Sequence, residues 1–227
     1  MNIAVHRRVL LALLHKIYTR PELAPLLGFK GGTCLYFLHQ LPRFSIDLDF
    51  NVIDENDVFS SAAMEQILRT ELTINDVYEK ENTWLWNGVY EPGQWNVKVE
   101  VSKRKFGDEY EQKDLFGLTL PALTLDYQLS HKLCAITDRA LLQNRDIFDA
   151  HFLLRKHISL VDAVIRKRTQ KSTKAYLKAL LRFIPSHISR RGILDGLGEL
   201  LDEETKKWAQ AHLLEETLFL LRSRCEE

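Results

Sequence analysis

The sequence is poor in cysteine, has no net charge and contains no long apolar run. Its three cysteines, Cys34, Cys134 and Cys225, are far apart among 227 residues. Such an odd, scattered set forms neither a disulfide framework nor a CxxC metal site, and we expect a protein of the reducing cytoplasm. Lysine plus arginine and aspartate plus glutamate both total 31. The overall charge therefore gives no reason to expect a nucleic-acid partner.

The absence of long apolar runs argues against a membrane partner. A transmembrane helix needs about 18 or more apolar residues, and no window approaches that length. Near the N-terminus, VLLALL follows Arg7-Arg8 but ends after six residues at His15. A secretory signal has a longer apolar region and a cleavage site, so we expect an amphipathic helix here. With 45% hydrophobic and 27% charged residues, the composition is that of an ordinary globular protein.

Hydrophobic periodicity predicts an α+β protein in two parts, a mixed domain over 1–122 and an all-helical domain over 123–227. Strands are expected at 44–52, 73–80, 83–90, 95–102 and 115–125. Helices are expected at 3–19, 22–27, 34–41, 57–72, 126–142, 145–156, 159–168, 172–184, 190–200 and 203–223. We further expect a turn at Asn87-Gly88, a polar loop over 103–114 and a helix break at Pro185.

Two aspartates lie in the most strand-like segment, FSIDLDFNV (44–52). Apolar residues alternate there with Ser45, Asp47 and Asp49, the pattern of a half-buried strand. Asp47 and Asp49 would share a face, with side chains about 6 to 7 Å apart. Carboxylates this close repel unless a cation lies between them, and hard oxygen ligands suit Mg²⁺ or Mn²⁺. Ser45, on the same face, can bind phosphate or make only structural hydrogen bonds.

Glu100 is the candidate third carboxylate. It lies in WNVKVEVS (95–102), where valines alternate with polar residues, so we expect it on the polar face of a strand. Three carboxylates can hold two metal ions for in-line displacement at phosphorus.

The segment Lys30-Gly31-Gly32-Thr33 precedes the aspartates and a predicted helix. Glycines let the backbone approach an anion closely, and Thr33 can cap the helix. The N-terminus of a helix is a ready phosphate site. A lone DxD is more often a solvated strand face, and a lone GGT is more often a turn. Their combination, with Glu100 later, favours nucleotide and metal binding.

These motifs together resemble the AbiEii/AbiGii family of nucleotidyltransferase toxins, within the DNA polymerase β-like nucleotidyltransferase superfamily. The resemblance runs from about residue 28 to 156. The matching residues are Lys30-Gly31-Gly32-Thr33, Arg43 to Phe50 (RFSIDLDF), Lys98, Glu100, Lys132, Arg145-Asp146 and Asp149.

The resemblance implies a nucleotidyltransferase-type mixed sheet flanked by helices and a reaction dependent on Mg²⁺ or Mn²⁺. In that reaction a nucleoside monophosphate passes from an NTP to a hydroxyl and pyrophosphate leaves. Family members are toxins of toxin–antitoxin or phage-defence pairs, and some extend the tRNA 3′ end. The superfamily's third carboxylate is commonly aspartate, so the role of Glu100 as ligand or base stays open.

Lys132 and Asp146 are further candidates from the resemblance. Lys132 lies beside the apolar stripe of the helix expected over 126–142, from which it can reach inward as a point charge on the triphosphate. Asp146 is expected at a helix start, where a carboxylate is favourable in any case. It can position Lys132 or the nucleotide.

Basic residues are concentrated between residues 155 and 191, where eleven lysines and arginines face a single acid, Asp162. Such charge segregation can attract a polyanion. We expect RNA or another nucleic acid to bind at a basic surface made of Arg166, Lys167, Arg168, Lys171, Lys174 and Lys178. An antitoxin with an acidic surface would fit these basic residues equally well.

The sequence therefore predicts a nucleotidyltransferase toxin acting on an RNA end, with tRNA as the expected acceptor. One alternative is nucleotidylation of a protein hydroxyl. The other is a catalytically silent module of this fold that only binds RNA or protein.

Overall fold

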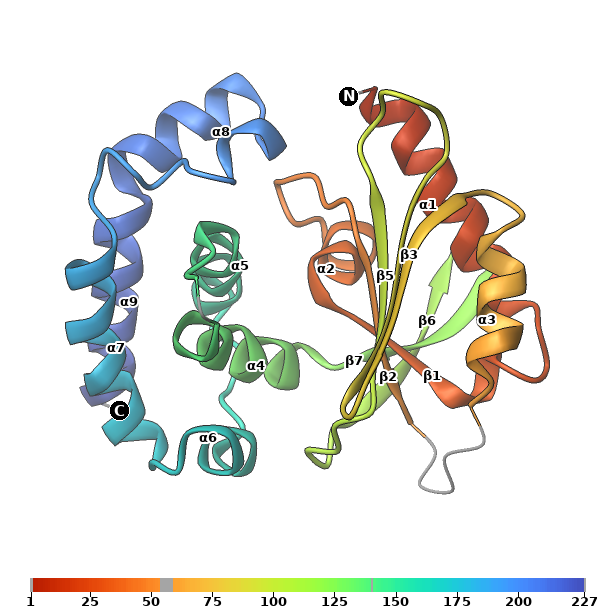
Figure 1. Ribbon diagram of the computed structural model, residues 1–227. Coiled ribbons are helices and arrows are strands. Elements are labelled where there is room, and N and C mark those ends of the chain that lie inside the picture. The colour runs from red at the N-terminus through yellow and green to blue at the C-terminus, as the bar shows by residue number, and fades with distance from the viewer. Residues whose placement is uncertain (1, 54–58, 140, 227) are drawn as a thin grey trace. The chain divides into compact units, whose positions relative to one another are not determined.

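The computed structural model describes residues 2–53, 59–139 and 141–226, and its helices and strands are labelled in Figure 1. The chain folds into two compact units. Unit 1 comprises Met1–Gln40, Phe44–Lys105 and Glu109–Leu123. Unit 2 comprises Leu41–Arg43, Phe106–Asp108 and Thr124–Glu227. The segments 41–43 and 106–108 thus group with the helical unit although they are embedded in the sequence of the first.

The described part of unit 1 contains a seven-stranded mixed sheet with the strand order β3-β4-β5-β2-β1-β7-β6. Its strands are β1 (Leu27–Lys30), β2 (Leu48–Val52), β3 (Thr73–Lys80), β4 (Thr83–Val89), β5 (Val97–Ser102), β6 (Tyr110–Leu115) and β7 (Leu118–Leu123). The pairs β1–β7 and β2–β5 are parallel, and the other neighbours are antiparallel. The expected α+β class with a mixed sheet is confirmed.

The core of unit 1 lies against one face of this sheet. The helices α1 (Ile3–Tyr18) and α3 (Ser61–Leu68) are on the same side of the sheet, and α2 (Gly31–His39) is on the other (Figure 1). Val99 and Leu48 are fully buried in this core. The alternation along β2 and β5 thus sends apolar side chains into the core and leaves their polar neighbours on the opposite face.

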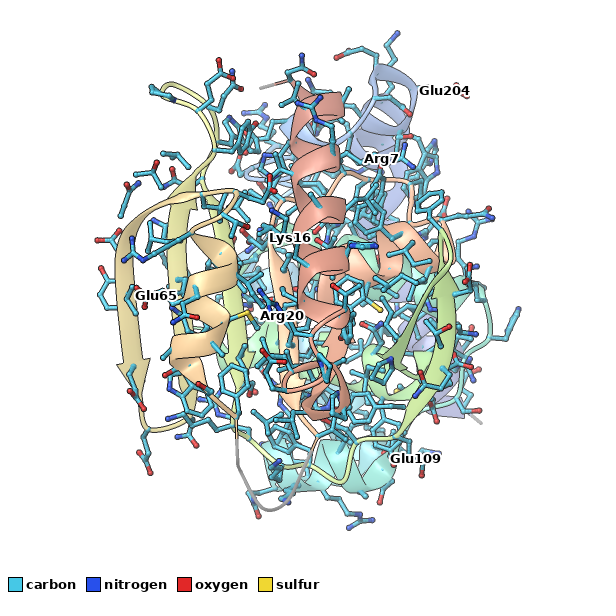
Figure 2. The ribbon with its side chains drawn as sticks, turned by 90° about the vertical axis from the view of Figure 1, so that its right-hand side faces the viewer. Arg7, Lys16, Arg20, Glu65, Glu109 and Glu204 are labelled. Carbon is cyan, nitrogen blue, oxygen red and sulfur yellow. The ribbon has the colours of Figure 1, made fainter. Side chains whose placement is uncertain are left out.

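The helix α1 is amphipathic, as its sequence predicts. Its buried side includes Leu10, Leu13 and Ile17, all fully buried. Arg7 and Lys16 are labelled on this helix in Figure 2; Arg7 is exposed. The ammonium group of Lys16 pairs with Glu71. Within the described residues, no helix is long and apolar enough to cross a bilayer.

Unit 2 is helical. Its α-helices are α4 (Leu125–Asp138), α5 (Asn144–Arg155), α6 (Asp162–Thr169), α7 (Thr173–His187), α8 (Glu203–Trp208) and α9 (Leu214–Glu226). A π-helical segment, Ala209–Leu213, joins α8 to α9 without a break. Shorter 3₁₀ turns occur at Ala24–Leu26 in unit 1 and at Gly198–Leu200 in unit 2.

Two expectations about the sheet are wrong. Asn87-Gly88 is not a turn but lies inside β4, where Gly88 pairs with Val97 of β5. A Cβ at Gly88 would lie 2.8 Å from the carbonyl oxygen of Thr73, so glycine permits close strand packing there. The predicted loop over 103–114 contains the strand β6. As an edge strand β6 can be polar, which hides it from a hydrophobic pattern.

The strand expected from residue 44 begins only at Leu48. The neighbouring strand β1 ends opposite Asp49, where the chain enters α2, and β5 pairs with β2 from Leu48 onward. Residues 44–47 therefore lie before the strand rather than in it. The helix expected over 57–72 is α3, although residues 57 and 58 lie outside the described part of the chain.

Two expectations about the helical part also fail. Pro185 lies inside α7 rather than ending it. Pro185 removes only its own N–H donor from the hydrogen-bond ladder, and the amide of Ile188 still donates to the carbonyl of Ile184 at 3.0 Å. The helix expected over 190–200 is a series of turns that ends in the 3₁₀ turn Gly198–Leu200.

Candidate active site

Asp49 lies against the first turn of α2. Strand β1 leads directly into this helix through Lys30, the N-cap, and Gly31, whose φ is +80°. A Cβ on Gly31 would lie 2.4 Å from Oδ2 of Asp49. Both the backbone conformation and this contact require glycine. The strand–turn–helix thus places a carboxylate beside a helix N-terminus, where backbone N–H groups lack intrahelical partners.

Strand register brings a second carboxylate next to Asp49. Asp49 of β2 pairs with Lys30 of β1 on one side and with Glu100 of β5 on the other. Directly opposed residues point to the same face of a sheet. The three charged side chains therefore form one row across the face opposite the apolar core.

Asp47 immediately precedes β2, and Lys98 connects it to Glu100. The amide of Lys98 donates to Oδ1 of Asp47 at 3.3 Å. Its Nζ lies 4.0 Å from Oδ2 of Asp47 and 3.5 Å from Oε2 of Glu100. The ammonium group of Lys98 thus contacts both carboxylates, at distances longer than a close ion pair.

The carboxylates do not form a ready metal cage. Across residues 2–53, 59–139 and 141–226, no three His, Cys, Asp or Glu side chains are arranged to hold a metal ion. The donor set nevertheless suits a hard cation. Asp47 and Asp49 are half-buried oxygen donors, and Mg²⁺ takes its remaining ligands from water and substrate phosphates.

Thr33 and Ser45 hold the segment that carries Asp47. Both are buried, and the hydroxyl of Thr33 donates to the carbonyl of Asp47 and lies 2.9 Å from Oγ of Ser45, which can donate to it. The expectation that Thr33 caps α2 is wrong, because Lys30 is the N-cap and Thr33 is the third residue of the helix. In this structure the hydroxyl of Thr33 supports the site from within.

His6 is a supporting residue that sequence reasoning missed. Its Nε2 lies 3.0 Å from the carbonyl of Ile46, and since a carbonyl only accepts, this nitrogen donates. Burial lowers the pKa of His6, although the carbonyl of Ile46 and the charge of Asp47 oppose that effect. A neutral His6 therefore anchors residue 46. The signal was available, because His6 is one helical turn from Leu10 on the buried side of the helix.

Lys132 and Asp146 belong to unit 2, where they form part of a buried ion cluster. Nζ of Lys132 lies 2.9 Å from Oδ1 of Asp146 and 2.7 Å from Oδ2 of Asp149. Arg43 donates to both oxygens of Asp149 from Nε at 2.6 Å and from Nη2 at 2.7 Å. Nε of Arg139 lies 2.9 Å from Oδ2 of Asp146. Lys132 is therefore an inward-pointing cation rather than a solvent-facing one.

The cluster keeps Asp149 and Lys132 ionised. Burial alone would raise the pKa of Asp149, but Arg43 and Lys132 outweigh it and lower that pKa to about 2. Burial would lower the pKa of Lys132, yet the charges of Asp146 and Asp149 raise it. Both aspartates have fully buried side chains, so paired charges are what make their burial tolerable.

Two members of the predicted basic surface pair with carboxylates: Arg166 pairs with Asp162, and Arg168 pairs with Asp138. Arg168 is half-buried, and Nη2 donates to Asp138 at 2.7 Å while Nη1 lies 2.8 Å from Nδ1 of His131. Its charge is largely committed within unit 2. The exposed members on α6, α7 and the connection between them are Arg166, Lys167, Lys171, Lys174 and Lys178.

Comparison with known proteins settles the family. The model of the nucleotidyl transferase AbiEii toxin family, of type IV toxin–antitoxin systems, matches residues 12–217. The chain belongs to the AbiEii family. The resemblance and the enzyme class expected from the sequence are thereby confirmed: the chain is a nucleotidyltransferase of a toxin family. No curated protein matches the chain.

Solved structures agree with AbiEii membership at the level of the fold. JHP933 from Helicobacter pylori is 18% identical, with a TM-score of 0.59 over 99% of this chain and 93% of its own. A second H. pylori protein, named as a nucleotidyltransferase, is 20% identical, with a TM-score of 0.58 over 98% of this chain and 96% of its own. At these identities the likeness shows a shared fold.

Proposed function

We propose that this AbiEii-family chain uses Mg²⁺ or Mn²⁺ to transfer a nucleoside monophosphate from an NTP to the 3′ end of a tRNA. It would act in the cytoplasm as the toxin of a toxin–antitoxin or phage-defence pair, with its cognate antitoxin as partner. The observation that carries the proposal is the position of Asp49, against Gly31 and in register with Glu100.

In this proposal Asp47 and Asp49 hold the metal, and Glu100 serves as a third ligand or as the base. A bound divalent ion would neutralise charge on the transferred phosphoryl group and its leaving group. Glu100 could reach the metal only after Lys98, now 3.5 Å from it, turns toward the incoming phosphates. That exchange replaces a lysine–carboxylate contact with a lysine–phosphate contact at little electrostatic cost.

The nucleotide would be bound by Lys30, Gly31, Gly32 and the N-terminal turn of α2, with Thr33 and Ser45 supporting the segment that carries Asp47. Lys132 would provide a charge for the triphosphate, with Asp146 fixing its position. The acceptor oxygen attacks the α-phosphorus, and the bond from that phosphorus to the bridging oxygen breaks. Pyrophosphate leaves with the electron pair, and the acceptor's proton passes to the base, for which Glu100 is the candidate.

The two parts of the chain would divide the work. We assign the metal ligands to the domain 1–122, and acceptor binding together with Lys132 and Asp146 to the domain 123–227. The exposed cations on α6, on α7 and between these helices would contact the RNA backbone. Arg168 would contribute less, because its guanidinium group is already bonded within unit 2. Contacts of this kind recognise phosphate and shape rather than base sequence.

Incubation with each α-labelled NTP, Mg²⁺ and either total RNA or protein extract tests the proposal. We expect label on RNA of tRNA size from wild type and none from Asp49→Asn. Label on protein would instead make the chain a protein-nucleotidylating enzyme. No label on either, together with tight RNA binding, would indicate a silent binding module and overturn the proposed activity.

A further inference from the structure

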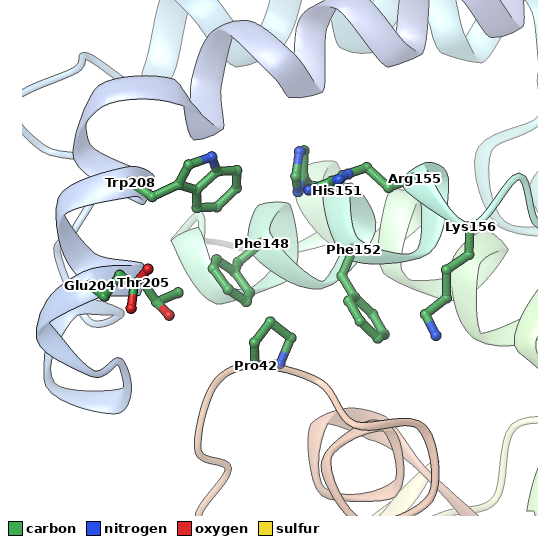
Figure 3. A pocket seen from close by; sticks show the side chains of 9 residues that line it. All are labelled: Pro42, Phe148, His151, Phe152, Arg155, Lys156, Glu204, Thr205 and Trp208. Carbon is green, nitrogen blue, oxygen red and sulfur yellow. The ribbon is translucent and has the colours of Figure 1, made fainter.

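An aromatic pocket in unit 2 lies outside the site described so far. Its volume is about 560 Å³, and it is lined by side chains of α5 and α8 and by Pro42 and Lys156 (Figure 3). Trp208 is half-buried, and its ring centroid lies 5.0 Å from that of His151 and 6.3 Å from that of Phe148. Burial lowers the pKa of His151, although Glu216 opposes this effect, so a neutral imidazole backs the indole. The indole ring of Trp208 is thus fixed by its neighbours, and part of its surface lines the pocket.

The pocket has a cationic end. Arg155 and Lys156 are exposed there, and Figure 3 shows them on the side away from Trp208. Nζ of Lys156 lies 4.7 Å from the ring centroid of Phe152. In the part of the chain that the structure describes, neither cation lies within salt-bridge distance of a carboxylate. They are therefore available to an anionic ligand.

The opposite end of the pocket accepts hydrogen bonds. Glu204 and Thr205 of α8 lie there, beside Trp208 (Figure 3). A carboxylate accepts from exocyclic amino groups such as N4 of cytosine. Aromatic surface, unpaired cations at one end and an acceptor at the other match one chemical unit: a nucleotide with its base on Trp208 and its phosphate near Arg155 and Lys156.

We propose that this pocket binds one nucleotide of the acceptor RNA strand, with a preference for bases that carry an amino group. The inference rests on the proposed function, which supplies the RNA. An RNA strand accounts for both features of the pocket, since successive nucleotides bring a stackable base and a phosphate at every step. The basic surface on α6 and α7 would then bind backbone only, and the pocket would hold a base.

The test measures binding of fluorescein-labelled hexacytidylate and hexauridylate to the full chain without NTP. Trp208→Ala should weaken hexacytidylate binding about tenfold, because one stacked base is lost. Trp208→Phe should keep affinity within about threefold, since a ring remains. RNA should also quench tryptophan fluorescence in wild type but much less in Trp208→Phe. We expect hexacytidylate to bind about threefold more tightly than hexauridylate, from a single added hydrogen bond.

The cationic end has a matched control. Arg155→Ala/Lys156→Ala should make the slope of log affinity against log salt less negative by about 1.4, the value for two phosphate contacts on a single strand. Lys207→Ala/Arg222→Ala removes the same charge at exposed positions outside the pocket lining, and should leave the slope unchanged. Circular dichroism checks that Trp208→Ala, which loses ring contacts, remains folded. The two double variants change only exposed side chains, so we expect them to fold like wild type.

The outcomes separate this inference from the proposed activity. If RNA binds equally well to wild type, Trp208→Ala and Arg155→Ala/Lys156→Ala, the pocket is not an RNA site, whether or not the enzyme transfers nucleotides. If free NTP but not RNA quenches the tryptophan fluorescence, the pocket binds the substrate nucleotide and the inference is overturned. Pocket-dependent RNA binding without any transfer to RNA would support the inference while the proposed reaction fails.

Discussion

Each unit contains a pair of neighbouring aspartates, and the two pairs are built in opposite ways. Asp146 and Asp149 have no exposed side-chain surface and meet the cations of Arg43 and Lys132 at 2.6 to 2.9 Å. The side chain of Asp47 keeps 14% exposure, and its cation, Lys98, is 4.0 Å away. A pair whose charge is already neutralised stabilises structure. We propose that the pair in unit 1, which is partly exposed and lies farther from its cation, binds a metal ion.

Removing the buried pair should give the largest effect. Asp149→Ala removes the buried carboxylate that pairs with both Arg43 and Lys132, and we expect it to lower the free energy of unfolding by about 3 to 5 kcal/mol. Urea denaturation followed by circular dichroism measures this. Glu215→Gln is the control, since Glu215 pairs with Arg190 at the surface and should cost less than about 1 kcal/mol. Equal losses in the two variants would contradict the contrast.

The second test moves Asp49 without changing its charge. Gly31→Ala places a Cβ against Oδ2 of Asp49, and a displacement of about 1 Å at a reacting centre can reduce the rate about 100-fold. We expect that loss in the nucleotidyl-transfer assay. Gly93→Ala is a matched control, because Gly93 has the same φ of +80° but nothing within 4 Å of the added Cβ. Similar activity in both variants would mean that the contact with Asp49 does not matter.

The third test uses pH. The pKa of Asp149 is lowered to about 2 in the folded chain, so the stability it contributes is present above about pH 4 and is lost as pH falls toward 2. We expect this contribution to be about 2 kcal/mol. Unfolding free energies of wild type and Asp149→Ala should therefore converge by that amount between pH 4 and 2. Curves that stay parallel would contradict the assigned ion cluster.

The smallest expected effect is stabilisation by metal. Mn²⁺ at ten times its dissociation constant should stabilise wild type by about 1.4 kcal/mol. Asp47→Asn should abolish the gain, whereas Asp149→Ala should keep it despite its lower starting stability. Differential scanning calorimetry with and without Mn²⁺ measures both. The same gain in Asp47→Asn as in wild type would place the metal elsewhere.

Local patterns predicted the carboxylate face well. The alternation in VKVEVS placed Glu100 correctly on a polar strand face, and the glycine at position 31 marked the turn into α2. Both signals are short in sequence, since a strand period and a glycine turn span only a few residues. The strand was nevertheless predicted to start too early, because its limit is set by where β1 ends.

Long-range pairing was beyond the sequence. Arg43 and Asp149 are 106 residues apart, and no periodicity links them. The edge strand β6 was not predicted because its polar residues face solvent. Pro185 was wrongly predicted to end a helix. In each case tertiary packing, rather than local sequence preference, determined the structure that formed.

The π-helical segment after Trp208 has a consequence for how this chain can vary. A π turn accommodates an extra residue, and each residue of a helix turns the side-chain direction by about 100°. Deleting one residue from Ala209–Leu213 would restore α-helical winding while pointing the indole away from His151. Homologues could therefore retain both flanking helices and every residue of α5, yet differ in whether the aromatic platform exists, through a single-codon change in length.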